Sequence, residues 1–130
     1  MTIMNYVIIA MQAIVGLSIL NVWLIQNKKA TKWRGGNANT IIEEFHAYGL
    51  STWSCYLIGV LKVILAILLI ISIWYPELKE FSALGLATLL LGSILMHFKI
   101  KDPLYKSFPA FLFFVMCTLI AASSHIKLYF

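Results

Sequence analysis

The sequence predicts an all-α membrane protein, a transmembrane four-helix bundle with a short amphipathic helix in the first cytoplasmic loop. Three observations predict this fold. Apolar residues make up 62% of the 130 residues and charged residues only 12%, whereas about a quarter of the residues in a soluble domain are charged. Four apolar stretches are long enough to cross a bilayer, which takes about 20 helical residues. These stretches are continuously apolar, which excludes the alternating pattern of transmembrane β-strands.

We expect residues 1–130 to form a single membrane domain. Its spans are predicted at residues 4–25, 53–75, 81–98 and 109–125. The first stretch lacks the basic n-region and the cleavage site of a signal peptide, so it is expected to be a true span. The third is short and would stand nearly upright in the bilayer. Aromatic residues near the span ends indicate a belt at the membrane surface: Trp23, Trp53, Trp74, Tyr75 and Tyr129.

The distribution of basic residues predicts the orientation. The loop after the first span holds Lys28, Lys29, Lys32 and Arg34, and the loop after the third holds Lys99, Lys101 and Lys106. The opposite side holds only Lys79 and Lys127. By the positive-inside rule, both basic loops lie in the cytoplasm and both termini on the outer side of the cell (inner) membrane. The net charge of +5 then indicates contact with anionic lipid, and no soluble basic face remains for nucleic acid.

The long first loop contains the signature of a short helix at residues 41–48. Thr40 and Glu43 have the spacing of a capping box. Gly49 stands where a left-handed residue ends many helices. An apolar stripe at Ile41, Phe45 and Tyr48 follows the helical repeat. We expect this helix to pack against the cytoplasmic half of the bundle.

Lys62 is the main candidate for a functional residue, because it lies inside the second apolar stretch. A charge at that depth needs a partner or a wet cavity. Glu43 and Glu44 on the loop helix are the nearest carboxylates, and Glu44 is preferred because Glu43 is engaged as a cap. The pair is either a structural ion pair or part of a ligand or quinone site. His97, at the end of the third span, is a further candidate for the same site, or suits the helix C-terminus as a cation.

Other polar and small residues predict helix packing. Gln12 and Asn21 can hydrogen-bond across the bundle. Gly85, Thr88 and Gly92 form a stripe on the third span that lets a neighbouring helix approach closely.

Several motifs together resemble the DoxX-like family of small four-helix membrane proteins. They lie in order along most of the chain from Trp33 onward, and comprise Trp33-Arg34-Gly35-Gly36, Glu43-Glu44-Phe45, Tyr48-Gly49-Leu50, Gly59-Val60-Leu61-Lys62, Met96-His97-Phe98-Lys99, Lys101-Asp102-Pro103 and Phe108-Pro109-Ala110. The family takes its name from a membrane subunit associated with a thiosulfate:quinone oxidoreductase. Other relatives are described as partners of redox enzymes or as assembly factors. The polar positions that match the family pattern are Glu43, Glu44, Lys62, His97 and Asp102.

The sequence shows no catalytic constellation. Nucleophilic triads, P-loops and dinucleotide fingerprints are absent, and no His, Cys and carboxylate cluster has metal-ligand spacing. Three function classes follow. The first is an accessory or anchor subunit of a membrane redox complex with a quinone or lipid against the bundle and no catalytic activity of its own. The second is an assembly or stability factor for other membrane proteins. The third, a carrier or channel, fits worst, because four spans with one lysine lack the broken helices and intramembrane charges of transporters.

Overall fold

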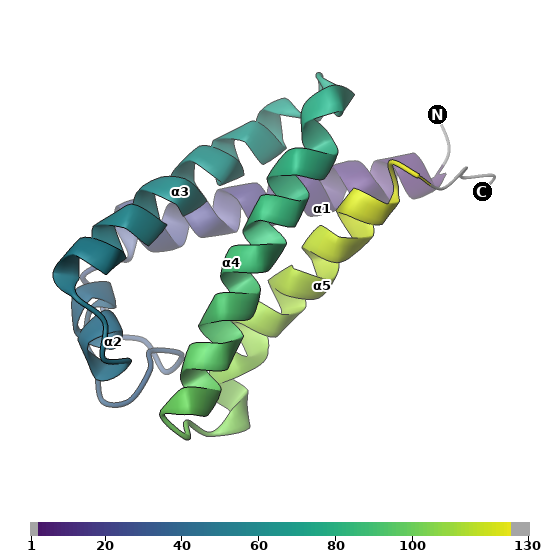
Figure 1. Ribbon diagram of the computed structural model, residues 1–130. Coiled ribbons are helices and arrows are strands. Elements are labelled where there is room, and N and C mark those ends of the chain that lie inside the picture. Colours follow the sequence, from purple (N-terminus) through teal and green to yellow (C-terminus); the bar gives the residue numbers. More distant parts are fainter. Residues whose placement is uncertain (1–2, 126–130) are drawn as a thin grey trace.

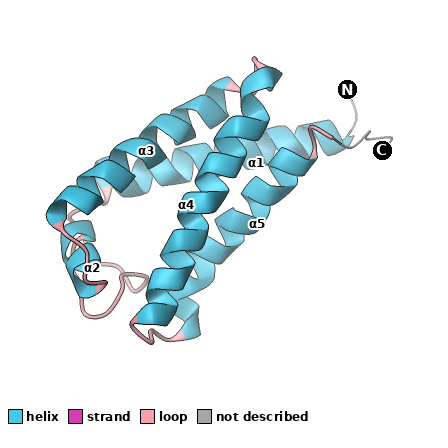
Figure 2. Ribbon diagram, viewed as in Figure 1, coloured by secondary structure: helices cyan, strands magenta, loops and turns pink. Residues whose placement is uncertain are grey.

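The computed structural model describes residues 3–125, which form four long helices and one short helix (Figure 1). The α-helices are α1 (Ile3–Leu20), α2 (Ile41–Ala47), α3 (Thr52–Ile71), α4 (Lys79–Lys99) and α5 (Phe108–Ala122). The π-helical turn η1 (Asn21–Ile25) extends α1, and the 3₁₀ turns η2 (Pro76–Leu78) and η3 (Leu104–Ser107) precede α4 and α5. Only helices and loops occur among the described residues (Figure 2), which confirms the predicted all-α class.

All four predicted spans are present as helices long and apolar enough to cross a membrane: Ile3–Ile25, Thr52–Ile71, Pro76–Lys99 and Leu104–Ala122. The chain is therefore a multi-pass membrane protein. The third span is not short as predicted, because it has 24 residues. Lys79 and Glu80 end the apolar run but not the helix, and Glu80 in the first turn suits the positive end of the helix dipole.

The long helices form a closed ring in which each packs against two neighbours. α1 contacts α3 and α5, and α4 also contacts α3 and α5. We call the end that carries residues 26–51 and 100–107 the loop end, and the opposite end, with η2 and the last turn of α5, the terminal end (Figure 1). Both basic loops share the loop end, as predicted. Which side of the membrane this end faces stays a prediction.

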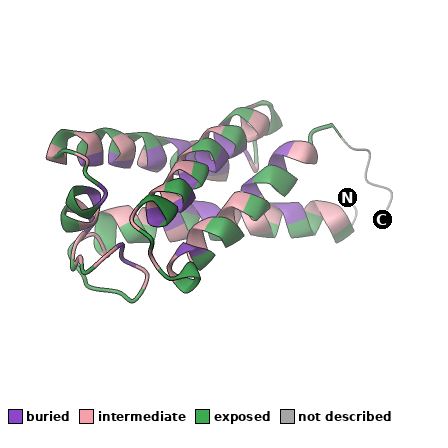
Figure 3. Ribbon diagram, turned by 60° about the horizontal axis from the view of Figure 1, so that its bottom comes forward, coloured by how far each residue is buried: buried purple, intermediate pink, exposed green. Residues whose placement is uncertain are grey.

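Near the terminal end the helices approach closely, and their buried residues face inward (Figure 3). A Cβ atom on Gly16 would lie 2.5 Å from Ile70 Cγ1 and 3.1 Å from the backbone oxygen of Ala66. Gln12 Nε2 donates a hydrogen bond to Ser72 Oγ at 2.8 Å, which confirms the predicted bond across the bundle. Small side chains and one buried amide thus hold α1 against α3.

Toward the loop end α3 and α4 separate (Figure 1), and residues of η1, α2, α3 and α4 line the space that remains. The predicted stripe on α4 is therefore right only in part. A Cβ atom on Gly85 would lie 2.9 Å from Leu65 Cδ1, whereas one on Gly92 would have no neighbour within 4 Å. Gly92 lines a cavity instead of a helix contact.

The short loop helix α2 forms as predicted. Thr40 Oγ1 accepts from the backbone N–H of Glu43, and the Glu43 carboxylate accepts from that of Thr40, which completes the capping box. Ile41 and Phe45 are buried against the bundle. Gly49 ends the helix with φ +83°, a conformation that favours glycine.

Candidate functional site

A buried carboxylate joins the end of α4 to the second loop. After α4, Lys101 adopts a left-handed conformation with φ 58°. The N–H of Asp102 then donates to the carbonyl of His97 at 3.0 Å, and that of Lys101 to the carbonyl of Phe98 at 3.1 Å, which is the Schellman arrangement. This turn brings Asp102 Oδ2 to 2.7 Å from His97 Nδ1. The pair is buried, so it fixes the imidazole ring at the loop end.

The same carboxylate binds the first loop. The backbone N–H of Gly36 donates to Asp102 Oδ1 at 3.0 Å, and Lys106 Nζ donates to the carbonyl of Gly36 at 2.6 Å. Gly36 has φ +57°, so a side chain at this position would be strained. Gly36 and Asp102 are 66 residues apart in the sequence, so these contacts hold the first basic loop against the second.

Glu44 also binds this glycine turn. Its Oε2 accepts a hydrogen bond from the backbone N–H of Gly35 at 2.6 Å. Gly35 lies directly against Tyr48, whose Cε1 would be 2.6 Å from an added Cβ atom. The Tyr48 hydroxyl lies 3.4 Å from His97 Nε2. Burial raises the pKa of this hydroxyl, and the Glu44 and Asp102 carboxylates raise it further, so the group stays protonated.

Arg34 is buried within the first loop, although the positive charge of this loop was expected to contact anionic lipid. Its Nη2 donates to the carbonyl of Gln26 at 2.7 Å and to that of Lys29 at 3.2 Å. Burial lowers the pKa of the guanidinium, and the nearby Glu44 carboxylate opposes this effect. The positive-inside pattern thus includes one residue that closes the loop instead of contacting lipid.

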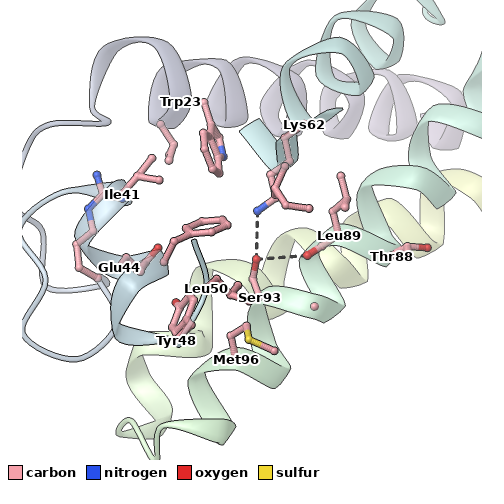
Figure 4. A pocket seen from close by; sticks show the side chains of 15 residues that line it. Trp23, Ile41, Glu44, Tyr48, Leu50, Lys62, Thr88, Leu89, Ser93 and Met96 are labelled. Atoms are coloured by element: carbon pink, nitrogen blue, oxygen red, sulfur yellow. Dashed lines mark hydrogen bonds between the residues drawn. The ribbon is translucent and has the colours of Figure 1, made fainter. Parts of the chain in front are cut away.

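Lys62 faces inward from α3, but it does not form the predicted direct ion pair. Its Nζ donates to Ser93 Oγ on α4 at 3.1 Å (Figure 4). The same atom lies 5.4 Å from the centre of the Trp23 ring, where a cation is attracted. Within residues 3–125 no glutamate comes within ion-pair distance of it. The reason is local, because Glu43 is used in the capping box and Glu44 by the N–H of Gly35.

Glu44 nevertheless lines the same cavity as Lys62, and its carboxylate attracts the Lys62 ammonium electrostatically. The cavity has two adjoining lobes of about 280 and 360 Å³. Both are lined by Trp23, Arg34, Glu44, Tyr48, Lys62 and Ser93. Figure 4 shows the first lobe. His97 lines only the second lobe. The structure therefore brings Lys62, Glu44 and His97 to one cavity, and leaves Glu43 at its exposed cap position.

Four of the polar and aromatic residues that line both lobes were not predicted as site residues: Trp23, Arg34, Tyr48 and Ser93. Ser93 is a polar residue inside the third span, and that position was the available signal. Trp23 was assigned to the membrane-surface belt, but it is half-buried and packs edge-to-face on Phe45 at 6.0 Å. In contrast, Trp53 and Trp74 are exposed as a belt requires, and Tyr129 lies outside the described residues.

The fold and the cavity define a class: a four-helix membrane protein whose two basic loops close a polar pocket at one end of the bundle. The model of the DoxX-like family matches residues 31–122. The chain belongs to this family, as the sequence motifs indicated. Comparisons with curated proteins and with solved structures give no match.

Proposed function

We propose that this chain is an accessory or anchor subunit of a quinone-linked membrane redox complex, without catalytic activity of its own. In this proposal the cavity beside Lys62 holds the head group of a quinone. The observation that carries the proposal is the Lys62 ammonium, which is 7% exposed and faces the cavity with the neutral Ser93 as its hydrogen-bond partner. A buried amine that has further N–H groups directed at a cavity favours a ligand that accepts hydrogen bonds.

The lining residues fit such a head group. A quinone ring accepts hydrogen bonds through its carbonyl oxygens and packs against aromatic rings. The cavity offers Lys62 Nζ as donor beside the rings of Trp23, Phe45 and Tyr48. Its lobes, at about 280 and 360 Å³, are near the lower limit of about 300 Å³ for small-molecule sites. When bound, the quinone would supply the electron-accepting chemistry of the complex, and this chain would position it and exclude water.

Binding of a tailless benzoquinone to the protein in lipid nanodiscs tests this proposal. Trp23 serves as the reporter in a variant whose other three tryptophans, Trp33, Trp53 and Trp74, are replaced by Phe. We expect saturable quenching of its fluorescence. Lys62→Met should weaken the affinity about tenfold, because a hydrogen bond from a charged donor contributes about 1.5 kcal/mol or more.

Lys79→Met is the matched control, since it removes the same charge near the terminal end. It should leave the affinity unchanged. Quenching that rises linearly without saturation, or an unchanged affinity in Lys62→Met, would contradict the head-group site.

The second candidate, an assembly or stability factor, is favoured by a different surface. An apolar groove of about 420 Å³ lies beside η3 and is lined by Trp33, Phe98, Leu104, Tyr105, Phe108 and Phe111. Five of these are aromatic, and such residues are enriched where proteins bind each other. An accessory subunit would remain in the finished redox complex. An assembly factor would co-purify with unassembled subunits and be absent from the finished complex, so composition after purification separates the two functions.

A further inference from the structure

Another hollow, larger than either lobe of the cavity, lies next to the cavity on the outside of the bundle. It is an apolar groove of about 630 Å³ between η1, α2 and α3. Leu24, Val60 and Ile64 line it and are 60%, 57% and 50% exposed, so the groove opens toward lipid. Its polar and charged lining, Asn27, Lys28 and Thr40, comes from the loop end. The groove thus has the apolar length and the polar rim of a site for an amphipathic molecule.

Trp23 lies at the boundary between this groove and the cavity. Its side chain lines the groove and both lobes of the cavity. Gly59 makes room for it, because a Cβ atom there would lie 2.7 Å from Trp23 Cε3 and Cζ3. The ring belongs to the π-helical turn η1, closed by a hydrogen bond from Gln26 N–H to the carbonyl of Asn21 at 2.9 Å. Turns of this kind are rare and occur frequently at functional sites.

Hydrogen bonds hold the two loops together at the loop end. There the glycine turn is bound to Asp102 and Glu44, and Lys99 Nζ donates to the carbonyl of Tyr48 at 2.8 Å. The apolar groove opens toward lipid, where a ligand dissolved in the bilayer would meet it. The Trp23 ring, which lines both this groove and the cavity, has its centre 5.4 Å from Lys62 Nζ.

We infer that the groove holds the prenyl tail of the quinone, and that the head group enters the cavity sideways from the bilayer past Trp23. This inference rests on the proposed head-group site and adds its tail site and its route. A phospholipid acyl chain is the competing occupant of the groove. If the groove holds the prenyl tail, filling it should weaken the binding of a tailed quinone more than that of a tailless one. If it holds an acyl chain, it should not.

The experiment compares two probes in nanodiscs, a tailless benzoquinone and the same ring with a decyl tail. Val63 lines the groove and neither lobe of the cavity, so Val63→Phe is the substitution that fills the groove. We expect it to weaken binding of the tailed probe about tenfold and to leave the tailless probe unchanged. Val60→Phe, at a more exposed position in the same groove, repeats the test in case Val63→Phe does not fold.

Val115→Phe is the matched control, because Val115 is exposed on α5 and lines none of these hollows. It should change neither affinity. If the tailless probe binds in a Lys62-dependent way but groove variants affect both probes equally or neither, the tail site is overturned and the head-group site stands. If the tailless probe does not bind while a spin-labelled phospholipid quenches Trp23 saturably, both proposals fail and the groove is a lipid site.

Discussion

The terminal half and the loop half of this bundle are built from the same four spans, but they are held together by different interactions. In the terminal half Gly16 lets α1 approach α3 until an added Cβ would overlap Ile70. In the loop half the same helices are separated by Trp23, and buried polar contacts such as Asp102 with His97 connect the elements.

The difference follows from the solvent. Apolar side chains gain little by leaving lipid for other apolar side chains, so close backbone approach at small residues drives helix association. Where no small residues meet, the helices need other connections, and hydrogen bonds supply them. Because the helices of the loop half stay further apart, a cavity remains between them, and Lys62 lines it. Close packing stabilises the terminal half, and buried polar contacts around a cavity connect the loop half.

The largest expected effect comes from a test of which side of the membrane each end of the bundle faces. We expect Asn37→Cys, at an exposed position of the loop end, to be inaccessible to an impermeant thiol reagent in intact cells, and Glu77→Cys at the terminal end to be labelled. The expected effect is all or none, because the basic loops are retained inside. The native Cys55 and Cys117 are buried, so they give little background. Labelling of Asn37→Cys from outside would overturn the predicted orientation.

Removing the Asp102 carboxylate should have the largest effect on stability. Asp102→Ala leaves the N–H of Gly36 and the ring of His97 without their acceptor. Loss of a buried charged acceptor costs on the order of 3 kcal/mol. The free energy of unfolding, measured in mixed detergent and SDS micelles, should fall by this amount, and proteolysis within residues 26–40 should accelerate.

Glu77→Ala is the control for that variant, since Glu77 is an exposed carboxylate at the terminal end. Its effect on the free energy of unfolding should stay within about 0.5 kcal/mol. Equal losses in the two variants would mean that the polar contacts at the loop end are not what holds that half together.

The parts of the fold that depend on local sequence could be predicted. The four spans follow from continuous apolar runs, and α2 follows from the capping box and from Gly49, all of which involve neighbouring residues. The span ends were less certain, because Lys79 and Glu80 stop an apolar run without stopping a helix.

The partner of Lys62 could not be predicted in the same way. Ser93 is 31 residues away on a facing helix, so the contact depends on how α3 and α4 are rotated, which apolar runs do not specify. Glu44 was the obvious carboxylate, but the N–H of Gly35 competes for it. A backbone donor next to a glycine leaves little trace in a single sequence, and the same holds for the inward position of Trp23.

The smallest expected effect is a matched pair of glycine substitutions, one in each half. Gly16→Ala places a Cβ atom 2.5 Å from Ile70 Cγ1, and the backbone oxygen of Ala66 at 3.1 Å limits any shift. Overpacking costs about 1–3 kcal/mol, which exceeds the gain of up to about 1 kcal/mol from replacing a helical glycine by alanine. Gly92→Ala has the same gain and no neighbour within 4 Å to oppose it.

We therefore expect Gly16→Ala to lower the free energy of unfolding by about 1 kcal/mol and Gly92→Ala to leave it equal or higher. Both variants are measured in the same micelles as Asp102→Ala. Because the two substitutions are chemically identical, the sign of their difference reports packing alone. A destabilised Gly92→Ala would show that α4 has a close neighbour at that position, and that the loop half is packed like the terminal half.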